Sequence, residues 1–342
     1  MTTSVAAERQ ANDLYATPVP PARRRIEAID MLRGLALVAM AIYHFGWDLE
    51  FFGYLQQGTT TVGGWKMLAR GTAGSFLFLA GVGLVLAHGT GAIRWRPFLL
   101  RLGKIYAAAA VITVATWFAF PDSFIFFGIL HAIGTFSLIG LAFLRVPGVI
   151  SILLGAAAIA APLYLRAPLF DTPALWWVGL STRPPLSNDY VPLFPWIGPF
   201  LAGMGVTRLL RTRMGALGRL AESAATTPPL TVAASAGRHS LAVYLIHQPV
   251  LIGLVYLASL VHPAPPPDLK ANYVESCVRA CSAEPAVVSC TAFCQCTLDR
   301  LEALNLFEPM NKGEIDLTSD ARITEMREQC TLSSPPVPSP TP

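Results

Sequence analysis

"LRGLALVAMAIYHFGWDLEFFGY", residues 32–54, is a long apolar run that also contains a histidine, an aspartate and a glutamate. A helix needs roughly 20 mostly apolar residues to cross about 30 Å of hydrocarbon, and this run is long enough. Its apolar residues are continuous rather than alternating, which favours a helix over a strand of a membrane barrel. The stretch therefore predicts a membrane-spanning helix that holds polar side chains within it.

Further stretches of similar character follow, and 53% of the whole chain is hydrophobic while only 13% is charged. These values lie well to the apolar side of soluble globular proteins. We expect an all-α, polytopic membrane bundle, residues 26–262, with about seven transmembrane helices at approximately 32–54, 70–88, 98–120, 124–144, 147–165, 191–210 and 239–261.

The positive charges predict the orientation of this bundle, because cytoplasmic loops of membrane proteins are enriched in Lys and Arg. With the amino terminus in the cytoplasm, most basic residues fall on the cytoplasmic side: Arg23, Arg24, Arg25, Arg94, Arg96, Arg101, Lys104, Arg145, Arg208, Arg211, Arg213, Arg219 and Arg238. Seven spans then place the carboxyl terminus outside. The net charge of +4 reflects this asymmetry and does not support nucleic-acid binding. Residues 1–25, polar and proline-containing, are expected to be disordered.

All six cysteines lie in the tail, residues 263–332, which we expect to be a small helical module outside the cytoplasm. Disulfides persist in that environment. Cys277 and Cys281 are four residues apart, as are Cys290 and Cys294, so each pair lies on one helix face. We favour an antiparallel helical hairpin bridged Cys277 to Cys294 and Cys281 to Cys290, with a third bridge from Cys296 to Cys330.

Six cysteines permit fifteen pairings, so the sequence alone leaves this pattern open. A zinc site is the alternative, but the tail contains no C-x-x-C pair and no histidine, and we expect no metal. The last residues, 333–342, are rich in proline and are expected to be a flexible end.

Three histidines lie in the middle of predicted spans. At 1.5 Å per residue, His44 lies about 18 Å above the start of its span at residue 32, His131 about 18 Å from the inner end of its span, and His247 about 13 Å up. Asp48 is one turn beyond His44 on the same helix face, where its carboxylate would accept the imidazole N–H and raise the basicity of the ring. These four residues are our candidate catalytic residues.

A structural role is the alternative for each histidine, since polar side chains also hold membrane helices together by hydrogen bonds. Ionisable groups inside the membrane are nevertheless candidates for function, and three at one depth favour a shared site. Candidate substrate-binding residues are Arg70, Trp47 and Trp176, although snorkelling and interface anchoring also explain residues of these types.

Five strings carry a resemblance to a known family: "RRRIEAIDMLRGLALVAMAIYH", "GSFLFLAGVGL", "FGILHAIGTFSLIG", "DYVPLFPWIGPFLAGMGVTR" and "GRHSLAVYLIHQPVL". Together, over about residues 25–262, they resemble the bacterial branch of the heparan-alpha-glucosaminide N-acetyltransferase catalytic-domain family, part of the wider transmembrane acyltransferases. The animal members place an important histidine in the loop after the first helix. The corresponding loop here, "GYLQQGTTTVGGW", has none, and His44 takes that role by its chemistry rather than by alignment.

The resemblance implies an integral membrane acyltransferase that moves an acetyl group from cytosolic acetyl-CoA to a sugar amine or hydroxyl of an envelope glycan or amino sugar on the far side. From the resemblance together with the orientation predicted from the charges and cysteines, we expect a multi-pass protein of the bacterial inner membrane with a periplasmic tail. The reactive residue in the family is a membrane-embedded histidine. His44 would deprotonate the acceptor or transiently take the acetyl group, and His131 or His247 would bind the oxyanion.

Acetyl-CoA is a large anion, so its binding surface must be basic and cytoplasmic. The candidate residues are Arg94, Arg96, Arg101, Lys104, Arg208 and Arg211, which also serve orientation, and Arg33, for which the alternative is to cap and anchor the first helix together with Asp30. Two other functions stay open. A transporter or flippase would use the histidines as a proton relay, although no internal repeat is visible. A scaffold would bind an envelope partner through its cysteine tail. A homo-oligomer is compatible with each of these functions.

Overall fold

The computed structural model of the chain describes residues 27–89, 92–210, 228–266, 268–282, 288–315 and 320–335. The predicted disordered segment 1–25 lies outside these residues, as does most of the Pro-rich end. The described part of the chain is all-α and contains no β-strand. This confirms the predicted fold class.

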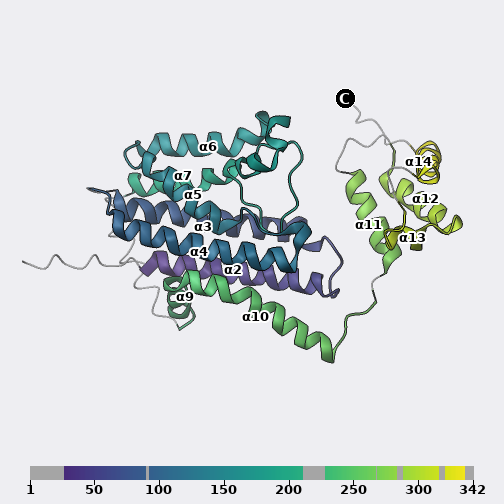
Figure 1. Cartoon of the computed structure of the whole chain (residues 1–342), viewed down its shortest axis with the longest axis horizontal. Coiled ribbons are helices and arrows are strands. Elements are labelled where there is room, and N and C mark those ends of the chain that lie inside the picture. Colours follow the sequence, from purple (N-terminus) through teal and green to yellow (C-terminus); the bar gives the residue numbers. More distant parts are fainter. Residues whose placement is uncertain are drawn as a thin grey trace, which may run out of the picture. The chain divides into compact units, whose positions relative to one another are not determined.

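Seven helices occupy the seven predicted stretches (Figure 1): α2 (Glu27–Phe51), α3 (Gly63–His88), α4 (Trp95–Ala119), α5 (Ile129–Phe143), α6 (Gly148–Tyr164), α7 (Leu193–Leu209) and α10 (Ser240–Val261). Among the described residues, α2, α3, α4 and α10 are long and apolar enough to cross a membrane. The helices α5 and α6 are apolar but shorter, so the number of spans stays a prediction.

Short elements complete this part of the chain. The helix α9 (Pro228–Arg238) precedes α10, and four 3₁₀ helices lie in the loops: η1 (Thr59–Thr61), η2 (Pro121–Ser123), η3 (Pro168–Asp171) and η4 (Pro173–Val178). The tail contains α11 (Leu269–Cys281), α12 (Cys290–Ala303), α13 (Phe307–Asn311) and α14 (Ala321–Ser333).

The chain divides into two compact units. The first consists of Met1–Ala39 and Gly71–Leu245, and the second of Met40–Arg70 and Ile246–Pro342. The boundaries fall within α2, α3 and α10, so each of these helices contributes to both units. The predicted domain boundary at residue 262 stays a prediction.

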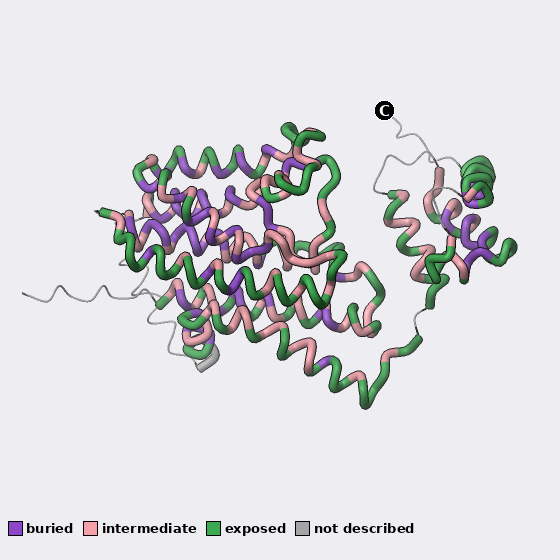
Figure 2. The backbone as a smooth tube through the Cα atoms, viewed as in Figure 1, coloured by how far each residue is buried: buried purple, intermediate pink, exposed green. Residues whose placement is uncertain are grey.

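The core of the first unit is built from α3, α4, α5 and α7. Leu77, Phe136, Phe200 and Met204 are all fully buried in it. Large apolar side chains are exposed on the outer faces of α4 and α6, which appear as green segments in Figure 2. A helix that is apolar on every side is typical of a membrane span, because hydrocarbon then contacts the face that protein does not cover.

Small residues bring α6 and α7 into close contact. A Cβ atom on Gly205 would lie 2.5 Å from the carbonyl oxygen of Gly148, and one on Gly155 would lie 2.8 Å from the carbonyl oxygen of Gly198. Ser151, on the same face of α6, is fully buried. This use of small residues is typical of membrane helices, which associate through close packing rather than through the hydrophobic effect.

We predict that Gly205→Ala lowers the stability of the bundle by about 1–3 kcal/mol, because the added methyl group forces two closely packed backbones apart. The matched control is Gly103→Ala on α4, where an added Cβ meets no atom within 4 Å. The measurement is unfolding of the purified protein in detergent. Equal effects of the two substitutions would contradict the packing described above.

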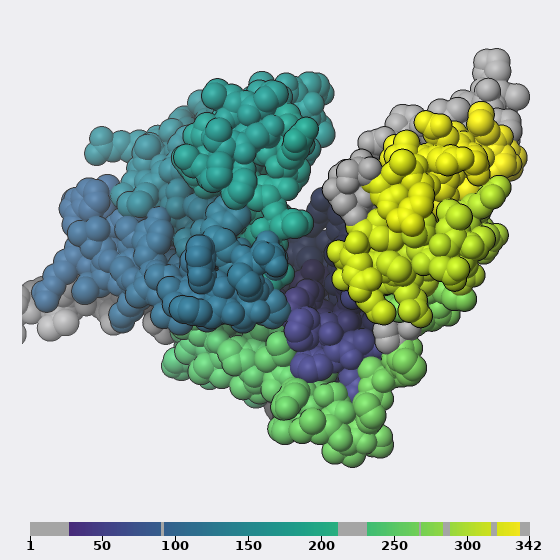
Figure 3. All heavy atoms as spheres, turned by 45° about the vertical axis from the view of Figure 1, so that its right-hand side comes forward, coloured from purple at the N-terminus to yellow at the C-terminus, as the bar shows by residue number. Residues whose placement is uncertain are grey.

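The tail helices of the second unit form a small core of their own. Leu298, Leu301, Phe307, Ile323 and Met326 are buried in it. The helices α12, α13 and α14 pack into one body, coloured yellow-green to yellow in Figure 3. The side chains of Asp268, Ser289 and Asp320 accept backbone N–H bonds at the starts of α11, α12 and α14, as N-cap residues do.

Three disulfides hold this tail. They join Cys277 to Cys294, Cys281 to Cys290, and Cys296 to Cys330, with Cα–Cα distances of 5.7–5.8 Å. The first two link α11 to α12 as an antiparallel hairpin, and the third links α12 to α14. These are the bridges that the spacing favoured, and no cysteine is left free. Bridges of this kind compensate for a core that is too small to be stable alone.

Candidate active site

Two helices of the second unit bring four polar side chains together. His44 and Asp48 lie one turn apart on α2, and His247 and Gln248 are consecutive residues of α10. The imidazole rings of His44 and His247 meet edge to face, with their centroids 5.0 Å apart. Gln248 Nε2 donates a hydrogen bond of 2.6 Å to Asp48 Oδ1. We call these four residues the histidine–aspartate cluster.

The predicted hydrogen bond between His44 and Asp48 is wrong. The partner of the carboxylate is Gln248, and Asp48 Oδ2 has no hydrogen-bond partner. Asp48 is fully buried. The amide of Gln248 reaches the carboxylate across from α10, whereas the imidazole of His44 packs against that of His247. Asp48 is therefore held by Gln248 and does not orient His44.

His131 belongs to the other unit and lies in the first turn of α5. Its Nδ1 accepts the N–H of Gly128 at 3.3 Å, which closes a capping arrangement at the helix start. Its Nε2 lies 3.4 Å from Thr113 Oγ1, and its ring stacks on Phe127. Within one unit, the structure thus brings together only two of the three predicted imidazoles. The described contacts of His131 are those of a residue that stabilises a helix terminus.

Asp189 stabilises the same helix start, although the sequence did not single it out. Its Oδ2 accepts the N–H of Ile129 at 2.8 Å, and an anion is favoured at a helix N-terminus. Burial nevertheless raises the pKa of this carboxyl to about 6, while the hydrogen bond from Ile129 acts in the opposite direction. The folded protein therefore binds a proton that the unfolded chain releases between about pH 4 and pH 6.

From this shift we predict that the free energy of unfolding falls as the pH rises from about 4 to 6, because the unfolded chain deprotonates first. Asp189→Asn keeps an oxygen for Ile129 and removes the charge. Above pH 6 we expect this variant to be more stable by up to about 3 kcal/mol, and near pH 4 to match the wild type. Unfolding curves between pH 4 and 7.5, with exposed Asp122→Asn as control, measure this. Parallel pH profiles of Asp189→Asn and wild type would refute it.

A cavity of about 120 Å³ lies in the first unit between α3, α4 and α5. Its polar lining consists of His88, Arg94, Arg101 and Ser137, and its apolar lining includes Phe98. His88 is buried and its ring meets that of Phe98 edge to face. Of the basic residues predicted to bind acetyl-CoA, the structure thus places Arg94 and Arg101 at one cavity.

Arg33 lies near this group. It pairs with Asp30 at 3.4 Å, and a Cβ on Gly83 would lie 3.0 Å from its Nη2. Its charge also acts on Arg101 by electrostatic repulsion. An anion bound beside Arg101 in the cavity would offset this repulsion.

The remaining predicted acetyl-CoA residues do not line the cavity. Arg96 and Lys104 are exposed on α4. Arg208 donates to the carbonyl oxygen of Val146, which ties the end of α7 to the loop between α5 and α6. Arg211 lies outside the described residues.

The residues predicted to bind the acceptor belong to different units: Trp47 and Arg70 to the second and Trp176 to the first. Trp47 stacks on Phe51, and Arg70 is exposed on α3. Trp176 lies in η4 of the other unit, where its ring packs against Phe126 and its Nε1 donates to the carbonyl oxygen of Asp171. These contacts leave Trp176 with an evident structural role in the loop.

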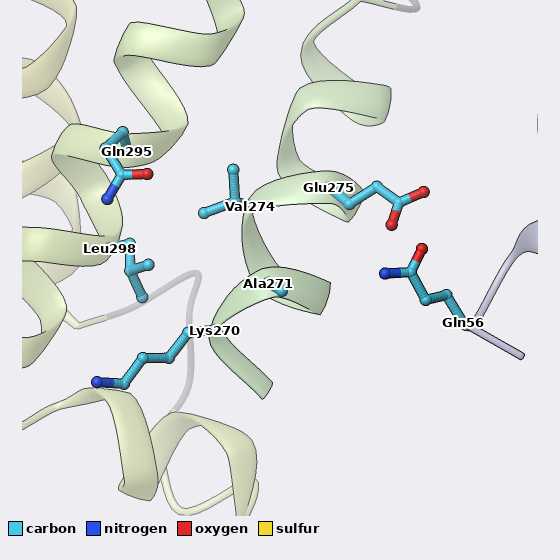
Figure 4. Close-up of a pocket in the computed structure, with 7 residues that line it drawn as sticks. All are labelled: Gln56, Lys270, Ala271, Val274, Glu275, Gln295 and Leu298. Atoms are coloured by element: carbon cyan, nitrogen blue, oxygen red, sulfur yellow. The ribbon is translucent and has the colours of Figure 1, made fainter. Parts of the chain in front are cut away.

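A larger surface pocket of the second unit, of about 420 Å³, lies between the loop after α2 and the tail helices α11 and α12 (Figure 4) and is lined by Gln56, Lys270, Ala271, Val274, Glu275, Gln295 and Leu298. Its charged side chains are already paired: Lys270 with Glu302, and Glu275 with Arg279 at 2.9 Å. The pocket contains no histidine and no arrangement suited to acyl transfer. We therefore do not regard it as the active site.

Sequence reasoning missed Gln248 and His88 as site residues. Gln248 follows His247 directly in "LIHQPVL", and an amide within an apolar span is as unusual as a histidine. His88 lies at the end of its predicted span and not in the middle, yet that end of α3 lines a cavity. In both cases the sequence shows a polar residue within or at the end of an apolar stretch. Which of these residues face one another depends on how the helices pair, and the sequence does not show this.

Comparison with known families decides the identity of this bundle. The family model described as "Heparan-alpha-glucosaminide N-acetyltransferase, catalytic" matches residues 25–249, well over half of the chain. The chain belongs to this family. The predicted family resemblance is thereby confirmed. No curated protein and no solved structure matched the chain.

Membership of the heparan-alpha-glucosaminide N-acetyltransferase family indicates a membrane acetyltransferase. The matched segment includes every residue of the histidine–aspartate cluster and the whole cavity between α3, α4 and α5. The disulfide-bonded tail, from α11 onward, lies beyond it. The chemistry of the family is therefore to be sought in the bundle.

Proposed function

We propose that the protein transfers an acetyl group from acetyl-CoA to the amine or hydroxyl group of a sugar. The observation that carries this proposal is the histidine–aspartate cluster within a segment that belongs to an acetyltransferase family. General-base catalysis requires a basic side chain, most often an imidazole, beside the proton that is to be removed. His44 and His247 are two imidazoles held together among apolar helices.

In this proposal, His44 accepts the proton of the acceptor N–H or O–H group while the nitrogen or oxygen attacks the thioester carbonyl carbon. The C–S bond then breaks, the coenzyme A thiolate leaves, and it takes up the proton. His247, whose ring contacts that of His44, donates a hydrogen bond to the oxyanion of the tetrahedral intermediate. The products are the acetylated sugar and free coenzyme A.

The cavity between α3, α4 and α5 fits part of the donor. Coenzyme A carries phosphates, for which arginine supplies bidentate, charge-assisted hydrogen bonds. Arg94 and Arg101 line the cavity and Arg33 lies near Arg101. A cavity of about 120 Å³ is smaller than those that enclose a drug-sized molecule, so it accommodates a phosphate-bearing end and not the whole thioester.

We further propose the inner membrane of a bacterium as the location, with the amino terminus and the arginine-lined cavity in the cytoplasm and the tail in the periplasm. Two features support this orientation: the basic residues are concentrated in one set of loops, and the tail contains three disulfides. The acceptor would then be an amino sugar or glycan of the cell envelope.

The test is incubation of the purified protein with acetyl-CoA labelled in the acetyl group and a panel of amino sugars and envelope glycans. We expect label on at least one sugar, with release of one coenzyme A for each acetyl group transferred. If the protein neither transfers label nor is stabilised against heat by acetyl-CoA, the proposal fails and transport of a polar substrate becomes the better account.

A further inference from the structure

Two hydrogen-bond acceptors of the histidine–aspartate cluster have no donor. Asp48 Oδ2 and Gln248 Oε1 are both buried, and neither has a hydrogen-bond partner. The bond from Gln248 Nε2 to Asp48 Oδ1 joins the amide to the carboxylate at 2.6 Å. Covalent geometry therefore keeps the two unpartnered oxygens in the same small region of the protein.

Unpartnered acceptors of this kind are rare, because a buried polar group without a hydrogen bond destabilises the folded state. A buried carboxylate is the more demanding of the two and normally pairs with a cation. Within the part of the chain that the structure describes, no ion pair involves Asp48. The protein thus maintains an arrangement that a ligand with N–H or O–H donors would complete.

We propose that Asp48 and Gln248 form the binding site for the reacting group of the acceptor substrate. This inference rests on the proposed function and goes beyond it, because it assigns the acceptor to two named side chains and makes Gln248 a specificity-determining residue. The bond from Gln248 Nε2 holds Asp48 in place. The free Oδ2 and Oε1 atoms then receive two hydrogen bonds from the acceptor.

His44 lies next to this pair, one helical turn before Asp48 on the same face of α2. A neutral imidazole offers one nitrogen as an acceptor. Together, the three side chains can present three acceptors: one carboxylate oxygen, one amide oxygen and one ring nitrogen. The proton that His44 removes is then one of those that the site binds.

Counting donors gives the specificity of such a site. A primary ammonium group carries three N–H donors, whereas a hydroxyl group carries one. The ammonium form of an amino sugar therefore satisfies all three acceptors and becomes the nucleophilic amine when His44 removes one of its protons, while a hydroxyl leaves buried acceptors unpaired. Sites that hydrogen-bond a substrate group discriminate strongly against analogues that lack the donors. The pair should thus favour an amine over a hydroxyl at the same position of the sugar.

Glucosamine and glucose form the matched probe pair, because they differ only in an amine or a hydroxyl at one carbon. The variants are Gln248→Met, which keeps the length of the side chain and removes its polar atoms, and Asp48→Asn, which removes the charge. The control is Gln295→Met, an exposed residue of the tail outside the family match. Each protein is first checked for an unfolding temperature close to that of the wild type.

For Gln248→Met we expect KM for glucosamine to rise at least tenfold, KM for acetyl-CoA to stay within twofold, and the preference for glucosamine over glucose to fall at least tenfold. Asp48→Asn should raise KM for glucosamine more than KM for glucose. If Gln248 only packs the helices together, its substitution would change KM for both sugars equally. Unchanged acceptor KM and sugar preference in a folded Gln248→Met protein would overturn the inference.

Direct binding separates this inference from the proposed function. The binding of glucosamine to the whole protein is measured by calorimetry without acetyl-CoA. If the wild type transfers no acetyl group but binds glucosamine, and Gln248→Met weakens that binding at least tenfold, the amine site stands and the acetyltransferase proposal fails. If the wild type transfers acetyl groups while Gln248→Met binds glucosamine as tightly as the wild type, the acceptor site proposed at Asp48 and Gln248 is wrong. The acetyltransferase proposal then still holds.

Discussion

Replacement of His44 by alanine is expected to lower kcat/KM for acetyl transfer by roughly 10²–10⁴-fold, the range associated with loss of a general base. The physical reason is that the acceptor must lose a proton as it attacks the thioester, and alanine has no ring nitrogen to accept that proton. The loss should appear mainly in kcat, because the substitution leaves unchanged the arginines that line the cavity between α3, α4 and α5.

The control for this experiment is His239→Ala, which changes an exposed histidine at the start of α10. We expect at most a twofold effect. His247→Ala should give an intermediate loss, since it removes an oxyanion donor and not the base. If His44→Ala retains more than a tenth of the wild-type kcat/KM, His44 is not the base.

Charge reversal at the cavity is expected to give the second large effect. Arg94→Glu and Arg101→Glu should each raise KM for acetyl-CoA about tenfold to a hundredfold, corresponding to about 1.4–3 kcal/mol of lost charge-assisted hydrogen bonding and added repulsion. The KM for the sugar should change little, because these substitutions lie in the cavity between α3, α4 and α5, which we propose binds the donor. Steady-state kinetics with acetyl-CoA as the varied substrate measure this.

Arg96→Glu is the matched control, because Arg96 is on the same helix and carries the same charge but does not line the cavity. We expect its effect on KM for acetyl-CoA to be less than threefold and to disappear at high salt, as for screened surface charge. If all three substitutions raise KM for acetyl-CoA equally, the basic residues attract the donor only by their overall charge, and the cavity has no special role.

The helices of this protein were predictable from sequence because apolar continuity is a local property. The run at residues 32–54 and the helix α2 agree closely, as do 239–261 and α10. The tail was predictable for a similar reason: cysteines four residues apart restrict which pairs two helices can form, and the observed bridges join Cys277 to Cys294 and Cys281 to Cys290.

The contacts of the candidate site were less predictable, because they depend on how the helices pair. His44 and Asp48 were correctly placed on one face of α2, but the partner of Asp48 is Gln248, two hundred residues away. His131 was expected in the middle of its span, but α5 begins at Ile129 and places this residue in the first helical turn, where it contacts Gly128 and Thr113. A depth along a helix does not say which neighbour a side chain faces.

The basic residues illustrate the same limit. The distribution of charge along the sequence placed Arg94, Arg96, Arg101 and Arg208 in one group, whereas the structure gives them different surroundings. Arg94 and Arg101 reach a cavity, and Arg208 donates to a backbone carbonyl. Only packing distinguishes a cation that meets a ligand from one that anchors a helix end.

The most direct test of the central claim, that an intramembrane histidine cluster acetylates a sugar with acetyl-CoA, uses proteoliposomes that hold glucosamine inside and receive labelled acetyl-CoA outside. We predict that the wild type accumulates labelled N-acetylglucosamine in the lumen, and that His44→Ala, reconstituted in equal amount, does not. Equal accumulation with both proteins, or none with the wild type in either orientation, would contradict the account.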